Sequence, residues 1–283
     1  MASYDAGGWQ VTDERTGRPV GGATTAEIGG VPAGRVTVGI CAIFKDEARD
    51  LPEWLAWHRQ IGISRFFLYD NDSTDGSASC CTGADVTVTP WRGYSQQMAA
   101  YAHCLRSRPA VDWLAFIDLD EFLLDPAGRR IDTILPETTA QYQGERVERV
   151  WVPWRMFGWK PHEVRPAGGV LQNYLWRAHD ASRLHAIEMQ AGKSIVQPSA
   201  VVLVPPPTPH HLLVEGLTWS DSGLVLNHYW TKSKQEAFKK ANQPRADNGL
   251  RRSWQQMLDL EWEMSAVYDD RIAQQARACG VVR

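Results

Sequence analysis

The sequence contains no long hydrophobic run. No stretch approaches the roughly 18 to 20 uninterrupted apolar residues that a membrane-spanning helix needs. Residues 1–8 also lack the basic and apolar regions of a signal peptide. We therefore expect a protein without a membrane span, located in the cytoplasm.

Cysteine is scarce and follows no metal-binding or disulfide pattern. The five cysteines are odd in number and show no Cys-x-x-Cys spacing, which argues against a disulfide framework and against a zinc knuckle. We expect reduced, structural thiols at Cys41, Cys80, Cys81, Cys104 and Cys279.

An excess of charge of one sign is also missing. The formal net charge is -3, with 22% charged and 43% hydrophobic residues, which is the composition of an ordinary globular protein. This balance gives no indication of a nucleic-acid partner. The oligomeric state is left open by the sequence.

The 283 residues fit one nucleotide-binding α/β unit with an elaborated C-terminal half. Residues 1–34, rich in Gly and Thr, are interpreted as a loose N-terminal extension. Residues 35–283 are predicted to form the domain. Within it we expect a nucleotide-binding half over 35–125, an acceptor-binding half over 126–245 and a helical segment over 246–283.

Apolar and polar residues alternate in blocks along the first half of the chain. Continuous apolar segments predict buried strands, and three- and four-residue spacing predicts amphipathic helices. The strands are expected at 35–44, 65–69, 86–88 and 113–117, with helices over 51–61 and 98–105. This order predicts an open, twisted, mostly parallel sheet flanked by helices, which binds ligands along the carboxyl edge of its strands.

The pattern is weaker after residue 130. We expect strands over 147–154 and 169–176, and helices over 233–242 and 253–279.

Two aspartates follow the apolar strand that ends at Ile117. In an extended segment Asp118 and Asp120 point to the same side, so both can approach one hard cation. Acidic residues at strand ends often simply face solvent, and a bare Asp-x-Asp does not decide between the two interpretations.

The segment from Asp70 to Gly76 follows another strand. Its Asp, Asn and Gly residues indicate a turn whose side chains bond their own backbone. Asp70 at the strand end can in addition accept a hydrogen bond from a base N–H such as the imide of uracil. Both roles are compatible with one loop.

A third feature lies far downstream, where an apolar segment from Leu224 ends at His228. A single histidine is more often a hydrogen-bonded structural residue than a ligand. Imidazole nevertheless suits Mn²⁺, and His228 is a candidate third ligand for a divalent ion. Lys232 would then meet diphosphate oxygens as a point charge.

The chain has thirteen tryptophans, and Trp151, Trp154 and Trp159 lie close together in sequence. Such rings either fill a core or offer flat apolar faces to a sugar. The three rings are candidates for the wall of an acceptor site.

Several of these motifs together resemble the family-2-like and family-92 glycosyltransferases. The resemblance spans about residues 36 to 240. It is carried by Ala42-Ile43-Phe44-Lys45-Asp46-Glu47-Ala48, Glu53-Trp54-Leu55-Ala56-Trp57-His58, Gly62, Tyr69-Asp70-Asn71-Asp72-Ser73-Thr74-Asp75-Gly76, Gln97, Tyr101-Ala102-His103-Cys104, Trp113-Leu114-Ala115-Phe116-Ile117-Asp118-Leu119-Asp120-Glu121-Phe122-Leu123, Phe157-Gly158, Lys193-Ser194-Ile195-Val196-Gln197-Pro198 and Asn227-His228-Tyr229-Trp230-Thr231-Lys232-Ser233.

The resemblance implies a GT-A fold and the transfer of a sugar from a nucleoside-diphosphate donor, commonly UDP-linked, to a glycan or small-molecule acceptor. It also implies a divalent cation, Mn²⁺ or Mg²⁺, held through Asp120. Asp70 would contact the base, Asp118 the ribose or a metal-bound water, and Lys193 and His211 the donor or acceptor. Further expected donor contacts are Phe44, Lys45, Glu47, Asp72, Gln97, Tyr101, Leu119 and Lys232.

The base that removes a proton from the acceptor hydroxyl is not identified by the sequence. Similar proteins often carry a Glu in the stretch equivalent to 170–174, where this chain has Leu171-Gln172-Asn173. An amide cannot act as a base, so Glu163, Asp180 and His179 are the candidates, and the stereochemical outcome stays open.

The sequence is also compatible with another class of enzyme and with a binding protein. A nucleotidyltransferase or a metal-dependent sugar-nucleotide hydrolase can also place carboxylates at a sheet edge. The loop Phe44-Lys45-Asp46-Glu47 lacks the Gly-rich, basic pattern usual in nucleotidyltransferases. A non-catalytic sugar-nucleotide-binding protein is the third possibility, supported by the amide at Gln172.

Overall fold

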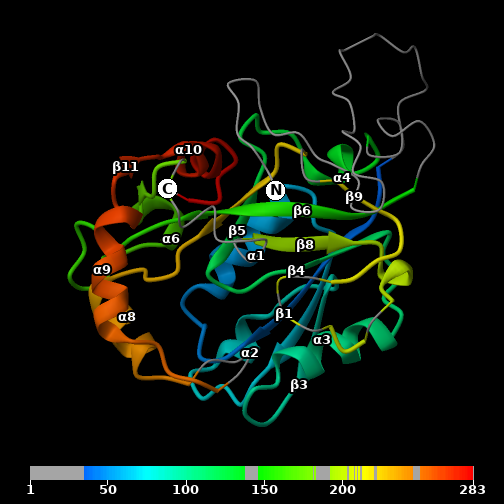
Figure 1. The fold of residues 1–283 in the computed structure, drawn as a ribbon, viewed down its shortest axis with the longest axis horizontal. Coiled ribbons are helices and arrows are strands. Elements are labelled where there is room, and N and C mark those ends of the chain that lie inside the picture. The colour runs from blue at the N-terminus through cyan, green and yellow to red at the C-terminus, as the bar shows by residue number, and fades with distance from the viewer. Residues whose placement is uncertain are drawn as a thin grey trace, which may run out of the picture. The chain divides into compact units, whose positions relative to one another are not determined.

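Four parallel strands form one half of the main sheet (Figure 1). The computed structural model describes residues 35–137, 146–180, 182, 192–202, 204–206, 208, 210, 212–219, 222–244 and 249–282. The four strands are β1 (Val38–Phe44), β2 (Arg65–Asp70), β3 (Val86–Pro90) and β4 (Trp113–Phe116). They lie in the order β3-β2-β1-β4, with β1 and β4 buried at every position. All four were predicted from their apolar sequences.

Strands from the second half of the chain extend this sheet beyond β4. β8 (Gly192–Val196) pairs antiparallel with β4, and β6 (Val147–Met156) pairs antiparallel with β8. β10 (Val225–His228) then runs parallel to β6, and β5 (Glu121–Leu124) lies antiparallel on β10. β9 (Leu217–Trp219) pairs with β6 off this path. The chain therefore leaves β4, turns at residues 117–120 and enters β5 on the far side of three other strands.

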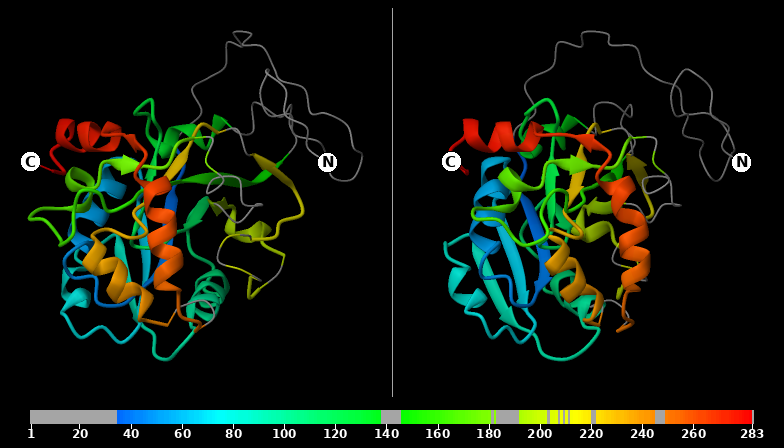
Figure 2. Two further views of the ribbon diagram at one scale, coloured as in Figure 1. Left: turned by 60° about the vertical axis from the view of Figure 1, so that its left-hand side comes forward. Right: turned by 90° about the vertical axis from the view of Figure 1, so that its left-hand side faces the viewer.

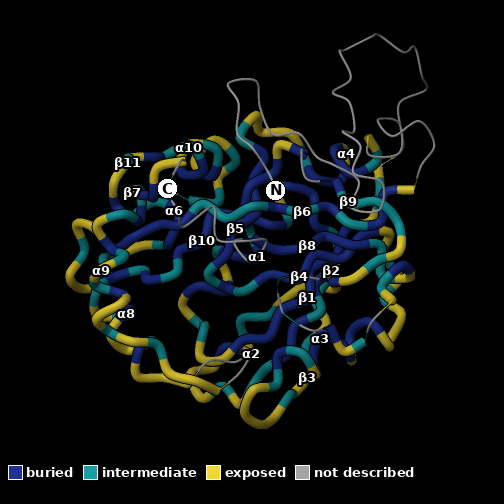
Figure 3. Tube along the Cα trace, in the orientation of Figure 1, coloured by how far each residue is buried: buried dark blue, intermediate teal, exposed yellow. Residues whose placement is uncertain are grey.

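Helices cover both faces of the parallel half. Ile40 and Ala42 of β1 pack in one apolar cluster with Leu51 and Trp54 of α1 (Leu51–Gln60). Cys41, the residue between them, packs in a second cluster that includes α3 (Gln97–Arg106). Side chains alternate between the faces of a strand, so β1 has to be apolar throughout. Figure 3 shows the resulting continuous burial along the inner strands.

The remaining helices are short except in the C-terminal part. They are α2 (Ser77–Cys80), α4 (Ile131–Ile134), α6 (Val170–Asn173), η1 (Pro198–Ala200), α8 (Lys234–Ala241), α9 (Trp254–Met264) and α10 (Arg271–Ala278). α8 and α9 lie side by side, with the rings of Phe238 and Trp254 5.3 Å apart (Figure 2). In the part of the chain that the structure describes, no helix is both long and apolar enough to cross a membrane.

Two predicted elements are wrong. Residues 169–176 were expected to form a strand, but they contain helix α6 instead. The carboxylate of Glu53 accepts hydrogen bonds from the backbone N–H groups of Val170 (2.5 Å) and Leu171 (3.3 Å), which satisfies donors at the start of this short helix. A side chain more than 100 residues away in sequence thus decides the local conformation.

The predicted helix over 253–279 is divided into α9 and α10. Between them β11 (Val267–Tyr268) pairs with β7 (Trp176–Arg177) as a two-stranded ribbon. Arg177 binds Asp269 through its Nε at 2.5 Å, and the backbone N–H of Asp269 donates to the carbonyl of Leu175 at 2.7 Å. These tertiary contacts outweigh the helical pattern of the segment.

The other expected elements agree with the structure to within a few residues. The predicted class, an α/β fold with a mostly parallel sheet flanked by helices, is confirmed by the strand order. Contacts between residues separate the chain into two units, Met1–Ala33 and Gly34–Arg283. The predicted N-terminal extension falls outside the described residues, and the division of 35–283 into functional parts stays a prediction.

Candidate functional site

The two aspartates lie in a turn between β4 and β5. The backbone N–H of Glu121 donates to the carbonyl of Asp118 at 3.1 Å, which closes the turn over Leu119 and Asp120. The sequence suggested extended backbone here. That expectation is wrong, because the chain must reverse its direction to reach β5. Each aspartate has its own set of partners, and a shared cation at both carboxylates stays a prediction.

Asp118 is held between a helix and a strand. Its Oδ1 accepts from Gln97 Nε2 at 2.7 Å, and its Oδ2 lies 2.8 Å from the ammonium group of Lys193. Gln97 also bonds the hydroxyl of Tyr101 at 3.0 Å. Burial by itself would raise the pKa of Asp118, but the charge and hydrogen bond of Lys193, together with the charge of His228, lower it. Asp118 is therefore a carboxylate with a fixed orientation.

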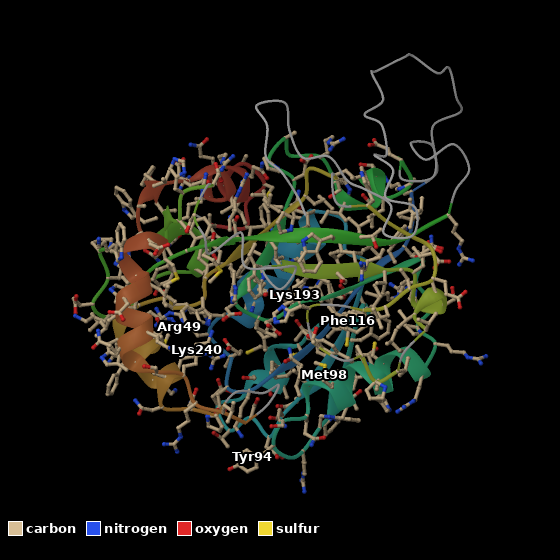
Figure 4. All side chains as sticks on the ribbon, in the orientation of Figure 1. Arg49, Tyr94, Met98, Phe116, Lys193 and Lys240 are labelled. Atoms are coloured by element: carbon tan, nitrogen blue, oxygen red, sulfur yellow. The ribbon has the colours of Figure 1, made fainter. Side chains whose placement is uncertain are left out.

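Asp120 lies between an imidazole and a second ammonium group. Its Oδ1 is 3.5 Å from His228 Nε2, and its Oδ2 is 2.5 Å from Lys240 Nζ. The carbonyl of Asp120 accepts from the backbone N–H of Tyr229 at 2.8 Å. Burial would raise the pKa of Asp120, yet Lys240 and His228 hold it well below the usual range. Lys193 and Lys240 are labelled in Figure 4 and come from β8 and α8.

Glu121 supports the turn from beneath and is fully buried. Its Oε2 accepts from the backbone N–H of Asp118 at 2.7 Å, and its Oε1 accepts from Trp154 Nε1 at 2.8 Å. Lys193 Nζ lies 3.6 Å from Oε2. Burial is the largest effect on this carboxyl and raises its pKa to about 7.

Strand register explains why these side chains meet. Glu121 stands opposite His228 in the β5–β10 pair, Trp154 stands beside Leu226 in the β10–β6 pair, and Lys193 stands opposite Val152 in the β6–β8 pair. Paired residues, and residues two apart along one strand, share a face of the sheet. Four strands thus project Glu121, His228, Trp154 and Lys193 from one face.

Lys232 belongs to an ion network beside this cluster. Its ammonium contacts Asp50 and lies 3.3 Å from Glu47 Oε2, and Asp50 is also bound by the guanidinium of Arg165. Burial would lower the pKa of Lys232, but the two carboxylates raise it. Arg165 continues the network to Glu236 in the first turn of α8 at 2.6 Å.

The loops that follow β1 and β2 are joined at the carboxyl edge of the sheet. Ser73 Oγ accepts from the backbone N–H of Asp46 at 3.0 Å, and Asp46 Oδ1 accepts from the N–H of Thr74 at 2.7 Å. Asp70 Oδ1 accepts from the N–H of Ser73 at 3.0 Å, which is the local turn bonding expected from the sequence. Asp70 is half-buried at this edge.

The other residues that were predicted to contact the sugar-nucleotide donor differ in exposure. Phe44 is buried in the core, and Lys45 is exposed. Asp72 lies 3.4 Å from the Nε of Arg92, and Leu119 is buried among apolar side chains. Their roles toward a nucleotide stay predictions.

The three clustered tryptophans have different surroundings. The ring of Trp154 lies 4.6 Å from that of His228 and 5.1 Å from that of His210, so Trp154 is part of the site. Trp159 is buried and stacks on Trp254 in a separate apolar cluster. Trp151 lies on the other face of β6 from Trp154, since the two are three residues apart in a strand. His211 lies outside the described residues.

The three candidate bases are exposed or paired with residues outside the turn that carries the two aspartates. Glu163 is 70% exposed and pairs with Lys234 at 2.8 Å. Asp180 pairs with Arg177 at 2.8 Å, beside the β7–β11 ribbon, and His179 next to it is exposed. The structure brings none of them into a described contact with Asp118 or Asp120, and the assignment of the base stays a prediction.

The side chains at Asp120 fit a divalent cation whose coordination is completed by a bound ligand. Asp120 and His228 present one oxygen and one nitrogen 3.5 Å apart, and His228 Nδ1 is buried without a described hydrogen-bond partner. No group of three or more His, Cys, Asp or Glu side chains within the described ranges is placed to hold a metal. Mg²⁺-type sites commonly use one or two protein ligands together with substrate phosphates and water.

A family model for "Glycosyltransferase family 92" matches residues 34–263. The chain belongs to glycosyltransferase family 92. The predicted resemblance is thereby confirmed, and it agrees with the GT-A type of fold expected from the sequence.

Curated relatives of this family-92 chain come from plants. It is 32% identical over 200 residues to the family 92 protein Os08g0121900 of Oryza sativa subsp. japonica, a match covering 67% of this chain and 32% of the relative. It is 31% identical over 215 residues to RCOM_0530710 of Ricinus communis, covering 71% and 37%. The chain spans about a third of the length of these relatives.

Solved structures with partial similarity to this family-92 chain are also known. A glucosyl-3-phosphoglycerate synthase from Mycobacterium tuberculosis, in complex with Mn²⁺, UDP and glucosyl-3-phosphoglycerate, is 16% identical over 63% of this chain and 64% of that chain, with a TM-score of 0.35. The mannosyltransferase PcManGT from Pyrobaculum calidifontis, with GDP-Man and Mn²⁺, is 21% identical over 44% and 37%, with a TM-score of 0.33.

Three residues of the site were not singled out from the sequence. Glu121 could have been found, because a carboxylate at the start of the apolar run Phe122-Leu123-Leu124 is unusual. Asp50 and Lys240 gave no such signal. Asp50 resembles an ordinary helix-start residue, and Lys240 follows Lys239 in what looks like a solvated last turn of a helix.

Proposed function

We propose that this family-92 chain transfers a sugar from a nucleoside-diphosphate sugar, UDP-linked in the first instance, to a hydroxyl group of an acceptor. The single observation that carries the proposal is the pair Asp120 and His228, which presents an oxygen and a nitrogen 3.5 Å apart beside cationic groups. Membership of the family supplies the reaction class.

Asp120 and His228 would hold a divalent cation, whose charge would stabilise the negative charge that the leaving diphosphate gains. Asp118 and Glu121 serve to hold the turn that carries Asp120, because both are locked by hydrogen bonds to Gln97, Lys193 and Trp154. A rigid turn keeps Asp120 in position without reorganisation during the reaction.

Lys232 supports the same site through its charge. Its ammonium contacts Glu47 and Asp50, and its positive charge contributes to lowering the pKa of Asp120. In this proposal Lys232 contributes positive potential toward the diphosphate, while the loops after β1 and β2 receive the nucleoside at Asp70.

Trp154 is the acceptor contact that the geometry supports best among the three tryptophans. Its ring lies against His228, and its indole N–H is bonded to Glu121, so one ring face is fixed near the reacting centre. A flat apolar surface of this kind suits the C–H face of a sugar. Trp159 is buried against Trp254 and fits a core role.

The test is incubation of the protein with a panel of nucleotide sugars and Mn²⁺, with and without a panel of sugar and alcohol acceptors. We expect one donor to release its nucleoside diphosphate in a Mn²⁺-dependent and acceptor-dependent manner, with a product heavier than the acceptor by one sugar. Equal release without acceptor would indicate a hydrolase. Release of a sugar 1-phosphate, with transfer of the nucleoside monophosphate, would indicate a nucleotidyltransferase. Binding of the nucleotide sugar without turnover would indicate a binding protein.

A further inference from the structure

Lys240 is the cation in closest contact with the carboxylate of Asp120 among the described residues. It lies in the last turn of α8, and its Nζ is 2.5 Å from Asp120 Oδ2 and 2.9 Å from the carbonyl of Trp230. Its neighbour Lys239 is exposed on the same helix. One of two adjacent lysines thus points inward to the site.

The contact is in conflict with a metal at Asp120. An ammonium group and a divalent cation on one carboxylate place like charges a few ångströms apart, where they repel each other strongly. A cation that binds at Asp120 would therefore displace Lys240 or be weakened by it.

Lys240 has the capacity for another partner. An ammonium group has three N–H donors, of which the described residues use two, and 27% of the side chain is exposed. The lysine stem is flexible and its charge is compact, so the group can follow a nearby anion. A phosphate oxygen beside Asp120 would be such an anion.

The helix itself is anchored at its other end. Ser233 Oγ accepts from the backbone N–H of Glu236 in a capping box, and Glu236 is paired with Arg165. Movement of Lys240 therefore requires only new side-chain torsions in the last turn and leaves the start of α8 in place.

We propose that Lys240 is an exchangeable counter-ion of Asp120: it neutralises this carboxylate before the donor binds, and it moves to a diphosphate oxygen when a divalent cation arrives with the nucleotide. The inference rests on the proposed function and adds to it a residue that couples metal and nucleotide. Because Lys240 competes with the metal and attracts the diphosphate, each ligand strengthens binding of the other.

The test measures binding rather than turnover. In Lys240→Met, we expect Mn²⁺ alone, followed by the electron paramagnetic resonance signal of the free ion, to bind about tenfold more tightly than in wild type. UDP in saturating Mn²⁺, followed by calorimetry, should bind about tenfold more weakly. Tenfold corresponds to about 1.4 kcal/mol.

Two matched variants separate this exchange from general effects of charge. Lys239→Met removes the same charge one residue away on the exposed side of α8 and should bind both ligands as wild type does. Lys240→Arg keeps the charge and should retain the weak binding of Mn²⁺ alone. Its folding and that of Lys240→Met are compared with wild type by thermal unfolding.

Failure of the exchange and failure of the proposed function would give different results. If Lys240→Met binds Mn²⁺ alone no more tightly than wild type, while wild type still binds Mn²⁺ with UDP, the exchange is wrong and the proposed function stands. If Lys239→Met reproduces both effects, the cause is general charge and the exchange is again wrong. If wild type takes up no Mn²⁺ with or without UDP, both the exchange and the proposed function are overturned.

Discussion

Glu121 and His228 stand directly opposite each other in the antiparallel pair of β5 and β10, with His228 Nδ1 3.9 Å from Glu121 Oε1. The two residues are more than 100 positions apart in sequence. Their pairing brings the turn at Asp120, which directly precedes β5, against the end of β10. The candidate metal ligands therefore meet because of strand register rather than because of proximity along the chain.

Replacement of Asp120 is the most direct test of the metal site. Asp120→Asn keeps the size of the side chain but removes the charge, so Mn²⁺-dependent release of nucleoside diphosphate should fall by about 100-fold or more. Asp259→Asn, on the exposed side of α9, is the matched control and should retain activity. Unchanged turnover in a folded Asp120→Asn protein would remove Asp120 from the metal site.

His228 is tested by metal affinity. His228→Ala should weaken the binding of Mn²⁺ in the presence of UDP, because one of two protein ligands is lost. Titration of Mn²⁺ against the UDP-saturated protein measures the change, with wild type as the reference. A titration curve that coincides with that of wild type would show that His228 lies outside the metal shell.

Trp154 and Trp159 should respond differently to substitution. Trp154→Phe removes the hydrogen bond to Glu121 and leaves a buried carboxylate oxygen without its donor, at a cost of about 1 to 3 kcal/mol in stability. It should also raise the KM for the acceptor more than the KM for the donor. Trp159→Ala opens the core next to Trp254 and should cost about 3 to 5 kcal/mol, with both KM values unchanged.

Steady-state kinetics and urea unfolding of the two variants provide the comparison. Equal changes in the acceptor and donor KM for Trp154→Phe would assign that ring to the framework of the site.

The pH dependence of stability contains a contribution from Glu261. Burial raises the pKa of this carboxyl from 4.5 to about 7. Between these pH values the folded protein keeps a proton that the unfolded chain releases, so the contribution of Glu261 is fully present below pH 4.5 and is lost as the pH rises through 7.

Glu261→Gln removes this titration. The Tm of wild type minus the Tm of the variant should therefore decrease between pH 5 and pH 8, as followed by circular dichroism. Glu163→Gln makes the same chemical change on a side chain that is 70% exposed and should preserve the pH dependence of wild type. A constant difference for Glu261→Gln across this range would contradict the raised pKa.

Asp50 should be important for stability although it lies outside the Asp-x-Asp motif. Burial acts to raise its pKa, but Lys232 and Arg165 lower it to about 2, so it is charged at neutral pH. Asp50→Asn leaves two largely buried cations with one fewer carboxylate and should cost about 3 to 5 kcal/mol. Urea unfolding measures the loss, and a cost below about 1 kcal/mol would show that the network is replaceable.

Local sequence patterns predicted the parallel half of the fold well. β1 was predicted from continuous apolar residues, because a strand buried on both faces is apolar at every position. α1 was predicted from three- and four-residue spacing, because a helix buried on one face repeats its apolar residues at that spacing. The second half was predicted less well. α6 depends on Glu53, and the interruption between α9 and α10 depends on Arg177, so no local window contains the cause.

The sequence alone determined the family, the apolar strands and the aspartates that follow one of them, since these are properties of neighbouring residues. The tertiary structure decided the partners of those aspartates. Lys193, Gln97, Lys240 and His228 reach them from four separate elements. Polar contacts of this kind depend on distance in space, which the arrangement of strands and helices sets.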